Sequence, residues 1–129
     1  MPLVIKIAPD NSEEELQGMA EAFMQHGIDG VCVGNTTLSR EGVQGLKHGE
    51  EQGGLSGAPL TPIANRALAA MRHALNGRIP IIGVGGINSA DDALEKQRQG
   101  ADLVQIYSGL IYQGPGLIGD IARAWPKGI

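Results

Sequence analysis

The stretch Pro80-Ile81-Ile82-Gly83-Val84-Gly85-Gly86 decides the fold. A short apolar run of this kind is typical of a strand in a parallel sheet. Two glycines end the run, and Ser89 with Asp91 and Asp92 then predict the start of a helix. The stretch therefore predicts a strand, a glycine turn and a helix in succession.

The same unit recurs on both sides of this stretch. Strands are expected at Val4–Ala8, Gly30–Gly34 and Leu103–Tyr107. Val4–Ala8 is nearly continuously apolar, so we expect this strand to be buried on both faces of the sheet. Helices are expected after Ser12 and after Thr61, each serving as an N-cap, and again after Pro115 as far as Ala124. Four β-α units in strict alternation indicate an α/β fold, with parallel strands and helical crossovers. Periodicity alone fits an open doubly wound sheet or (β/α)4, half of a TIM (β/α)8 barrel.

A weak internal repeat supports these units. Gly27-Ile28-Asp29-Gly30-Val31 resembles Gly100-Ala101-Asp102-Leu103-Val104, and each segment follows a helix and opens a strand. The simplest interpretation is one helix-to-strand connector used twice.

Composition limits the class of protein. The 129 residues carry a formal charge of -4, and no linker divides them, so residues 1–129 are expected to form one unit. The mild acidity argues against a nucleic-acid partner, and we expect neither a membrane span nor a signal peptide. We therefore expect a cytoplasmic chain. The single cysteine, Cys32, excludes an internal disulfide, and three isolated histidines predict no metal site.

Several residues stand where parallel strands end, which is where ligands bind in such folds. A phosphate site formed by backbone amides is indicated by two such segments, Gly83–Ile87 and Tyr107-Ser108-Gly109. The alternative is that these glycine-rich turns only reverse the direction of the chain and bind no ligand. Lys6 is costly in a buried strand unless it is paired or contacts a ligand. Asn35 and Thr36 either orient a polar ligand or cap their own turn.

Five segments together resemble the dihydroorotate dehydrogenase family, in particular its class 2, quinone-linked branch. Their order and spacing match the family across essentially the whole chain. The segments are Lys6-Ile7-Ala8-Pro9-Asp10, Asn35-Thr36-Thr37, Gly53-Gly54-Leu55-Ser56-Gly57, Gly83-Val84-Gly85-Gly86-Ile87 and Val104-Gln105-Ile106-Tyr107-Ser108-Gly109.

The resemblance implies an FMN-containing barrel that oxidises dihydroorotate to orotate in pyrimidine biosynthesis and passes the electrons to a quinone. This chain would be the carboxyl-terminal half of that barrel. Asn35 and Thr36 would hold the orotate, and Lys6 would contact the flavin ring and stabilise its reduced form. The residues expected around the flavin are Lys6, Gly34, Gly57, Gly85, Gly86, Tyr107 and Ser108.

The sequence differs from the pattern of this family in two respects. The family usually has threonine where this chain has Gly34, so only a backbone contact to the flavin would remain there. The family's serine base lies in the amino-terminal half, as do the helices that associate with the membrane and form the quinone tunnel. We therefore expect no catalytic residue in this chain and no turnover by it alone. Its partner would be a second copy or a complementary half-barrel. The alternative is a self-assembling phosphate- or flavin-binding module without catalysis.

Overall fold

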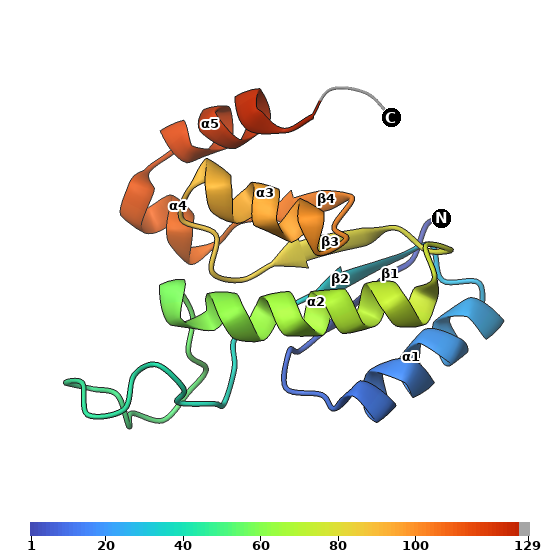
Figure 1. The fold of residues 1–129 in the computed structure, drawn as a ribbon, viewed down its shortest axis with the longest axis horizontal. Coiled ribbons are helices and arrows are strands. Elements are labelled where there is room, and N and C mark those ends of the chain that lie inside the picture. The colour runs from blue at the N-terminus through green and yellow to red at the C-terminus, as the bar shows by residue number, and fades with distance from the viewer. Residues whose placement is uncertain (127–129) are drawn as a thin grey trace.

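The computed structural model describes residues 1–126 and shows one parallel sheet of four strands (Figure 1). The strands are β1 (Val4–Ile7), β2 (Gly30–Val33), β3 (Ile81–Val84) and β4 (Leu103–Gln105). They lie in the order β1-β2-β3-β4, so each strand pairs with the next one along the chain. This order is that of a barrel wall, and it excludes the reversal of strand order that a doubly wound sheet requires.

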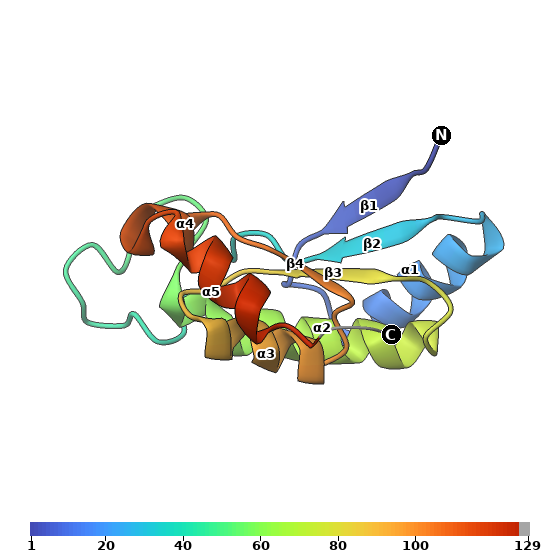
Figure 2. The ribbon, with the colours of Figure 1, turned by 90° about the horizontal axis from the view of Figure 1, so that it is seen from above.

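The helices are α1 (Glu13–Gln25), α2 (Thr61–Leu75), α3 (Ala90–Arg98), α4 (Ser108–Gln113) and α5 (Gly116–Ala124), with a short 3-10 helix at Ala58–Leu60. All but α4 lie on one side of the sheet, and α4 lies beyond the carboxyl ends of the strands (Figure 2). A sheet covered by helices on its outer face alone matches half of a (β/α)8 barrel. The predicted fold class is therefore confirmed.

Two apolar clusters fill the space between the sheet and the helices. The larger cluster joins β1, β2 and β3 to α1 and α2, with Leu16, Leu68 and Met71 at its centre. The smaller joins β4 to α3 and α5 through Leu117 and Ile121. Aliphatic residues make up nearly the whole core, as expected for a chain with 3% aromatic residues.

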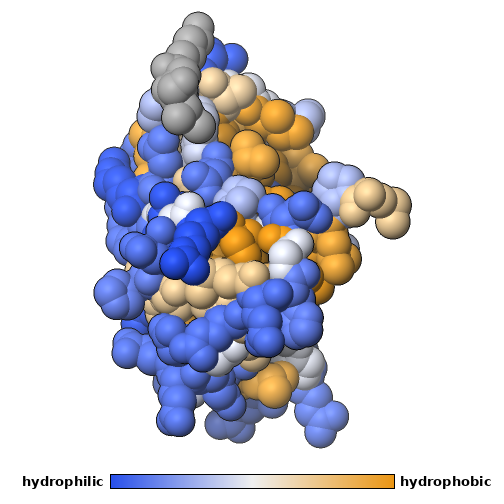
Figure 3. All heavy atoms as spheres, turned by 90° about the vertical axis from the view of Figure 1, so that its right-hand side faces the viewer, coloured by the Kyte–Doolittle hydropathy of each residue, from blue (hydrophilic) through white to orange (hydrophobic). Residues whose placement is uncertain are grey.

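The opposite face of the sheet is uncovered, which corrects the expectation that β1 is buried on both sides. Val4 and Leu103 are 47% and 61% exposed on this face. Lys6 is exposed as well, so its charge bears no burial cost in the described residues. Figure 3 shows hydrophobic atoms gathered on one side of the molecule and hydrophilic atoms on the other.

Helix starts follow the predicted chemistry with one exception. Ser12 and Glu15 form the expected capping box at α1, and Ser89 caps α3 through the backbone N–H of Asp92. Thr61 is not an N-cap, because α2 already includes it and its hydroxyl donates to the carbonyl of Gly86 at 2.8 Å. The hydroxyl thus ties α2 to the turn after β3.

The internal repeat has a structural cause. Asp29 accepts a hydrogen bond from the backbone N–H of Leu3 at 2.7 Å, just before β1. Asp102 accepts one from the N–H of Ile81 at 2.8 Å, where β3 begins. Each aspartate therefore fastens its own strand to the start of a preceding strand. The repeat reflects two equivalent β-α-β contacts at the amino-terminal edge of the sheet.

None of the helices within residues 1–126 has both the length and the apolar character needed to cross a membrane.

Candidate functional site

A cavity of about 500 Å³ opens at the carboxyl ends of the strands. This volume lies within the range of small-molecule and cofactor sites. The strand ends, the loop over residues 35–57 and α4 all lie on this side of the molecule (Figure 2). Eight of the nine predicted site residues line the cavity, namely Lys6, Asn35, Thr36, Gly57, Gly85, Gly86, Tyr107 and Ser108.

Gly34 is the exception. It precedes Asn35 but does not line the cavity in the described structure. Its φ is +126°, and an added Cβ would lie 2.1 Å from the carbonyl oxygen of Val84. The threonine that the resemblance implies at position 34 therefore does not fit this backbone, whose conformation only glycine adopts easily.

Lys6 reaches across the concave face of the sheet. Its Nζ donates to Oε1 of Gln105 at 3.1 Å, which joins the two outermost strands, β1 and β4. Three strand spacings of a flat sheet would separate these strands by about 14 Å. The contact is possible because the sheet is curled. Lys6 is also the only charged side chain among the lining residues that the structure describes, so the cavity favours an anion.

The turn after β3 is packed so closely that side chains are excluded. A Cβ on Gly86 would lie 2.1 Å from the Thr61 hydroxyl oxygen, and one on Gly109 would lie 2.0 Å from the carbonyl of Ile87. Backbone rather than side chains therefore forms this wall. Such a wall lets main-chain amides approach a phosphate. The predicted phosphate loops after β3 and β4 meet here.

Asn35 and Thr36 lie on the opposite wall. The Asn35 carboxamide oxygen accepts the backbone N–H of Thr36 at 2.9 Å, which directs its Oδ1 to its own turn. The Asn35 Nδ2 group is then the part of the side chain that can donate a hydrogen bond to a ligand. Thr36 packs against Gly54, where an added Cβ would lie 1.9 Å from its hydroxyl oxygen.

The returning end of the long loop closes the rim. Ser56 and Ser108 are joined by a 3.0 Å hydrogen bond between their hydroxyls, so this loop meets the end of β4. Gly57 follows with a φ of +79°, a conformation that favours glycine, and leads into the 3-10 helix. Two residues of the glycine-rich segment Gly53–Gly57, namely Ser56 and Gly57, thus line the cavity.

Cys32 lies beneath Lys6 and contacts Gln105, with Sγ 3.7 Å from its Oε1. Burial raises the pKa of the Cys32 thiol above its ordinary value, and the nearby Lys6 charge opposes this only in part. The thiol is therefore protonated at neutral pH, which suits a packed side chain better than a nucleophile. Residues 1–126 contain no cluster of His, Cys, Asp or Glu able to hold a metal ion.

Sequence reasoning missed three polar lining residues, Ser56, Asn88 and Gln105. Gln105 follows Leu103 by two positions and thus shares its face of the strand. The alternation of side chains along a strand could have predicted that Gln105 lies on the same face of the sheet as Lys6. The two residues are 99 positions apart in the sequence, and their contact depends on the curvature of the sheet, which a sequence pattern does not give.

Comparison with known proteins gives a consistent result. The profile of the dihydroorotate dehydrogenase family matches residues 1–127. A protein of Paracidovorax citrulli described as dihydroorotate dehydrogenase (quinone) is 56% identical over 124 residues, covering 96% of this chain and 34% of the relative. A Shewanella protein of the same description is 52% identical over 125 residues, covering 97% and 37%.

Solved structures agree with the sequence relatives. The crystal structure of DHODH from Eimeria tenella in complex with ferulenol superposes with a TM-score of 0.89 at 36% identity. The match covers 95% of this chain and 33% of that one. The chain thus spans about a third of the length of the relatives that it matches.

Proposed function

Because this chain belongs to the dihydroorotate dehydrogenase family, we propose that it supplies the flavin-phosphate site and part of the orotate site of a quinone-linked enzyme. The observation that carries the proposal is the cavity at the strand ends. It brings together eight separately predicted residues from all four β-α units. The complete enzyme would oxidise dihydroorotate to orotate in pyrimidine biosynthesis.

The cavity fits FMN on three counts. Its volume of about 500 Å³ suits a mononucleotide. Gly86 and Gly109 give a wall of backbone where a Cβ would collide, as close approach to a phosphate requires. Lys6 supplies the positive charge among the described lining residues, on the concave face of the sheet. When bound, FMN would accept a hydride from the substrate and pass electrons to the quinone.

Different residues of this chain would then bind FMN and orotate. Gly57, Gly85, Gly86, Tyr107 and Ser108 would hold the phosphate and ribityl chain. Lys6, held by Gln105, would place its ammonium against the ring end, where negative charge develops on reduction. Asn35 and Thr36 would orient orotate through the Asn35 amide donor and the Thr36 hydroxyl.

The sheet needs further strands for catalysis. β1 and β4 have no outer neighbours among the described residues, and water reaches Lys6 from the uncovered face. A closed barrel would exclude this water and strengthen the electrostatic effect of Lys6. We propose that a complementary half-barrel completes the wall and supplies the general base and the quinone tunnel. A second copy of this chain would close the wall without supplying either.

A chimera tests this function. The matching third of the Paracidovorax citrulli relative is replaced by residues 1–126, and reduction of a quinone by dihydroorotate is followed. We expect turnover by the chimera and none by the isolated chain. A folded chimera that retains FMN but shows no turnover would contradict the proposed orotate role, and one that loses FMN would contradict the flavin role.

A phosphate-binding half-barrel unrelated to flavin is the second candidate, supported by the backbone wall around Gly86. Lys6→Ala separates the two. If the site is a flavin site, FMN affinity falls while sulfate affinity hardly changes, because Lys6 faces the ring end. Equal losses for both ligands would favour the plain phosphate site.

A further inference from the structure

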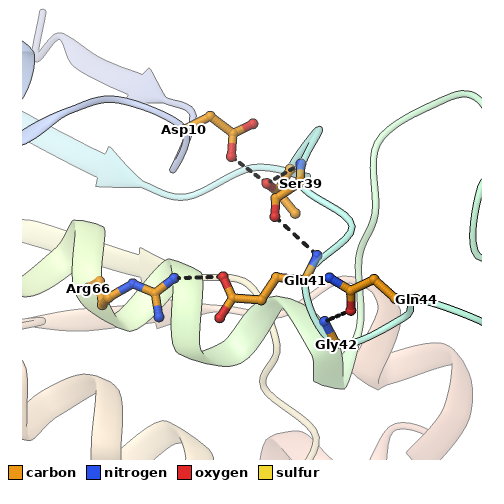
Figure 4. Close-up of polar contacts among 7 residues, drawn as sticks. Asp10, Ser39, Glu41, Gly42, Gln44 and Arg66 are labelled. Atoms are coloured by element: carbon orange, nitrogen blue, oxygen red, sulfur yellow. Dashed lines mark hydrogen bonds and ion pairs between the residues drawn. The ribbon is translucent and has the colours of Figure 1, made fainter.

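Thr37 is completely buried, although it directly follows Asn35 and Thr36, which line the open cavity. Its hydroxyl donates to Oδ1 of Asp10, and the other oxygen of Asp10 accepts the backbone N–H of Leu38 at 2.8 Å. Asp10 belongs to the loop after β1, whereas Thr37 and Leu38 belong to the loop after β2. Figure 4 shows Asp10 beside this second loop, close to Ser39. One carboxylate thus fastens two neighbouring strand ends together.

Contacts within the long loop hold Thr37 as well. Its backbone forms a two-bond antiparallel bridge with Leu55, at 3.0 Å and 2.8 Å. Its hydroxyl oxygen accepts the N–H of Ser39 at 3.0 Å. Thr37 is therefore the point where the loop after β1 and both ends of the long loop meet. A buried group with this many partners is costly to disturb.

The residues next to this point are Asn35 and Thr36. Thr36 packs against Gly54, which precedes the bridging Leu55. The direction in which Asn35 and Thr36 face the cavity is therefore set by how Thr37 is held. Neither Asp10 nor Thr37 lines the cavity itself.

We propose that Asp10 is a positioning residue that acts through Thr37 and holds Asn35 and Thr36 in the orientation that binds a planar carboxylate substrate. The inference rests on the proposed function, because it deepens the role given there to Asn35 and Thr36. It assigns part of the substrate affinity to a contact outside the cavity.

Asp29 offers a matched control at the other end of the sheet. Its carboxylate also accepts a backbone N–H from a neighbouring segment, that of Leu3 at 2.7 Å. Asp29→Asn therefore weakens the same kind of contact far from the cavity. A loss that comes only from reduced stability will appear in this variant as well.

The experiment compares Thr37→Val, Thr37→Ser, Asp10→Asn and Asp29→Asn with the parent chain. The side-chain amide signals of Asn35 are recorded by NMR without ligand. Affinities for FMN, and for orotate in the FMN-loaded chain, are then measured by titration. Thr37→Val keeps the shape and removes the hydroxyl, whereas Thr37→Ser keeps the hydroxyl. If Thr37→Val does not fold, Asp10→Asn carries the test.

We expect Thr37→Val and Asp10→Asn to shift or broaden the Asn35 amide signals and to weaken orotate binding roughly tenfold, as for loss of a hydrogen bond to a charged group. FMN affinity should stay within about twofold. Thr37→Ser and Asp29→Asn should match the parent.

Unchanged Asn35 signals, or equal losses of orotate and FMN affinity, would overturn the inference. If the parent chain binds neither ligand, the cavity does not form a flavin site without further strands, and the chimera decides on the proposed function. The Asn35 signals then decide separately whether Asp10 and Thr37 order this turn.

Discussion

Gly86 has a φ of +72°, and a Cβ placed there would lie 2.7 Å from the backbone nitrogen of Thr61. Because both strain and collision act against a side chain, we expect Gly86→Ala to destabilise the chain by about 2 kcal/mol or more. Urea denaturation measures the change. The helix α2 would have to move away from the turn after β3, so the phosphate wall would also be lost.

Gly18 in α1 is the matched control for Gly86. Nothing lies within 4 Å of a Cβ added there. Alanine is a better helix former than glycine, so Gly18→Ala should stabilise the chain by about 0.5–1 kcal/mol. Equal effects of the two substitutions would contradict the close packing described at Gly86.

The buried Lys96 leads us to expect that the stability of the chain rises with pH. It is 1% exposed, and its Nζ donates to Oδ1 of Asn65 at 2.6 Å. Burial lowers the pKa of Lys96 from an ordinary 10.5 to about 8, although Asp92 opposes the shift. Since the folded state binds this proton less tightly than the unfolded state, the free energy of unfolding should rise between about pH 8 and 10.5, by up to roughly 3 kcal/mol.

The test compares Lys96→Met with the parent, both carrying Cys32→Ser. The cysteine is removed because the raised pKa of Cys32 has the opposite sign and lowers stability as the pH rises above about 9. Denaturation profiles should rise with pH for the parent and stay flat for Lys96→Met. Parallel profiles would show that Lys96 titrates normally in the folded chain.

At the residue scale, the predictable features were local ones. The glycine turns, the capping box and the strand-end position of Asn35 follow from neighbouring residues in the sequence. Asp10, Thr37 and Lys96 could not be assigned in this way. Their partners lie 27 and 31 residues away, and only the packed structure shows which polar groups become buried.

The contact between Lys6 and Gln105 joins elements β1 and β4 and makes a testable pair. We expect Gln105→Leu to weaken FMN binding about threefold to tenfold, because Lys6 then loses the acceptor that holds it. Lys6→Ala should have the larger effect. The double variant should bind like Lys6→Ala alone, since Gln105 acts through Lys6. Fluorescence titration with FMN measures all three, and additive losses would show that Gln105 acts on its own.

At the element scale, all four strands and the helices α1, α2, α3 and α5 were expected from the sequence. Their ends shifted by a few residues. Helix α4 was missed, because its six residues around Gly109 carry no cap or apolar stripe and form against the turn after β3. Thr61 was misread because its hydroxyl serves a tertiary contact with Gly86 rather than the helix that it begins.

At the scale of the whole molecule, the open sheet predicts association. Val4 and Leu103 are exposed on the uncovered face, beside strands without outer neighbours in the described chain. Such edges and apolar faces tend to pair. We expect light scattering to show a dimer or larger assembly at micromolar concentration, and Leu103→Lys to weaken it. A monomer for the parent chain would contradict this.

The barrel character of the fold could be predicted from the resemblance but not from periodicity, which left two architectures open. The strand order and the contact across the concave face decide between them. The uncovered face could not be foreseen from apolar runs, because a strand that lines a barrel interior has the same composition as one covered by helices.

Titration of the chain with FMN, followed by flavin fluorescence, is the sharpest test of the flavin site. We expect saturable binding close to one FMN per chain, weakened by Lys6→Ala and abolished by Gly86→Ala. Lack of saturation up to about 1 mM, which corresponds to roughly 4 kcal/mol of binding free energy, would contradict it. The cavity would then not form a flavin site without further strands.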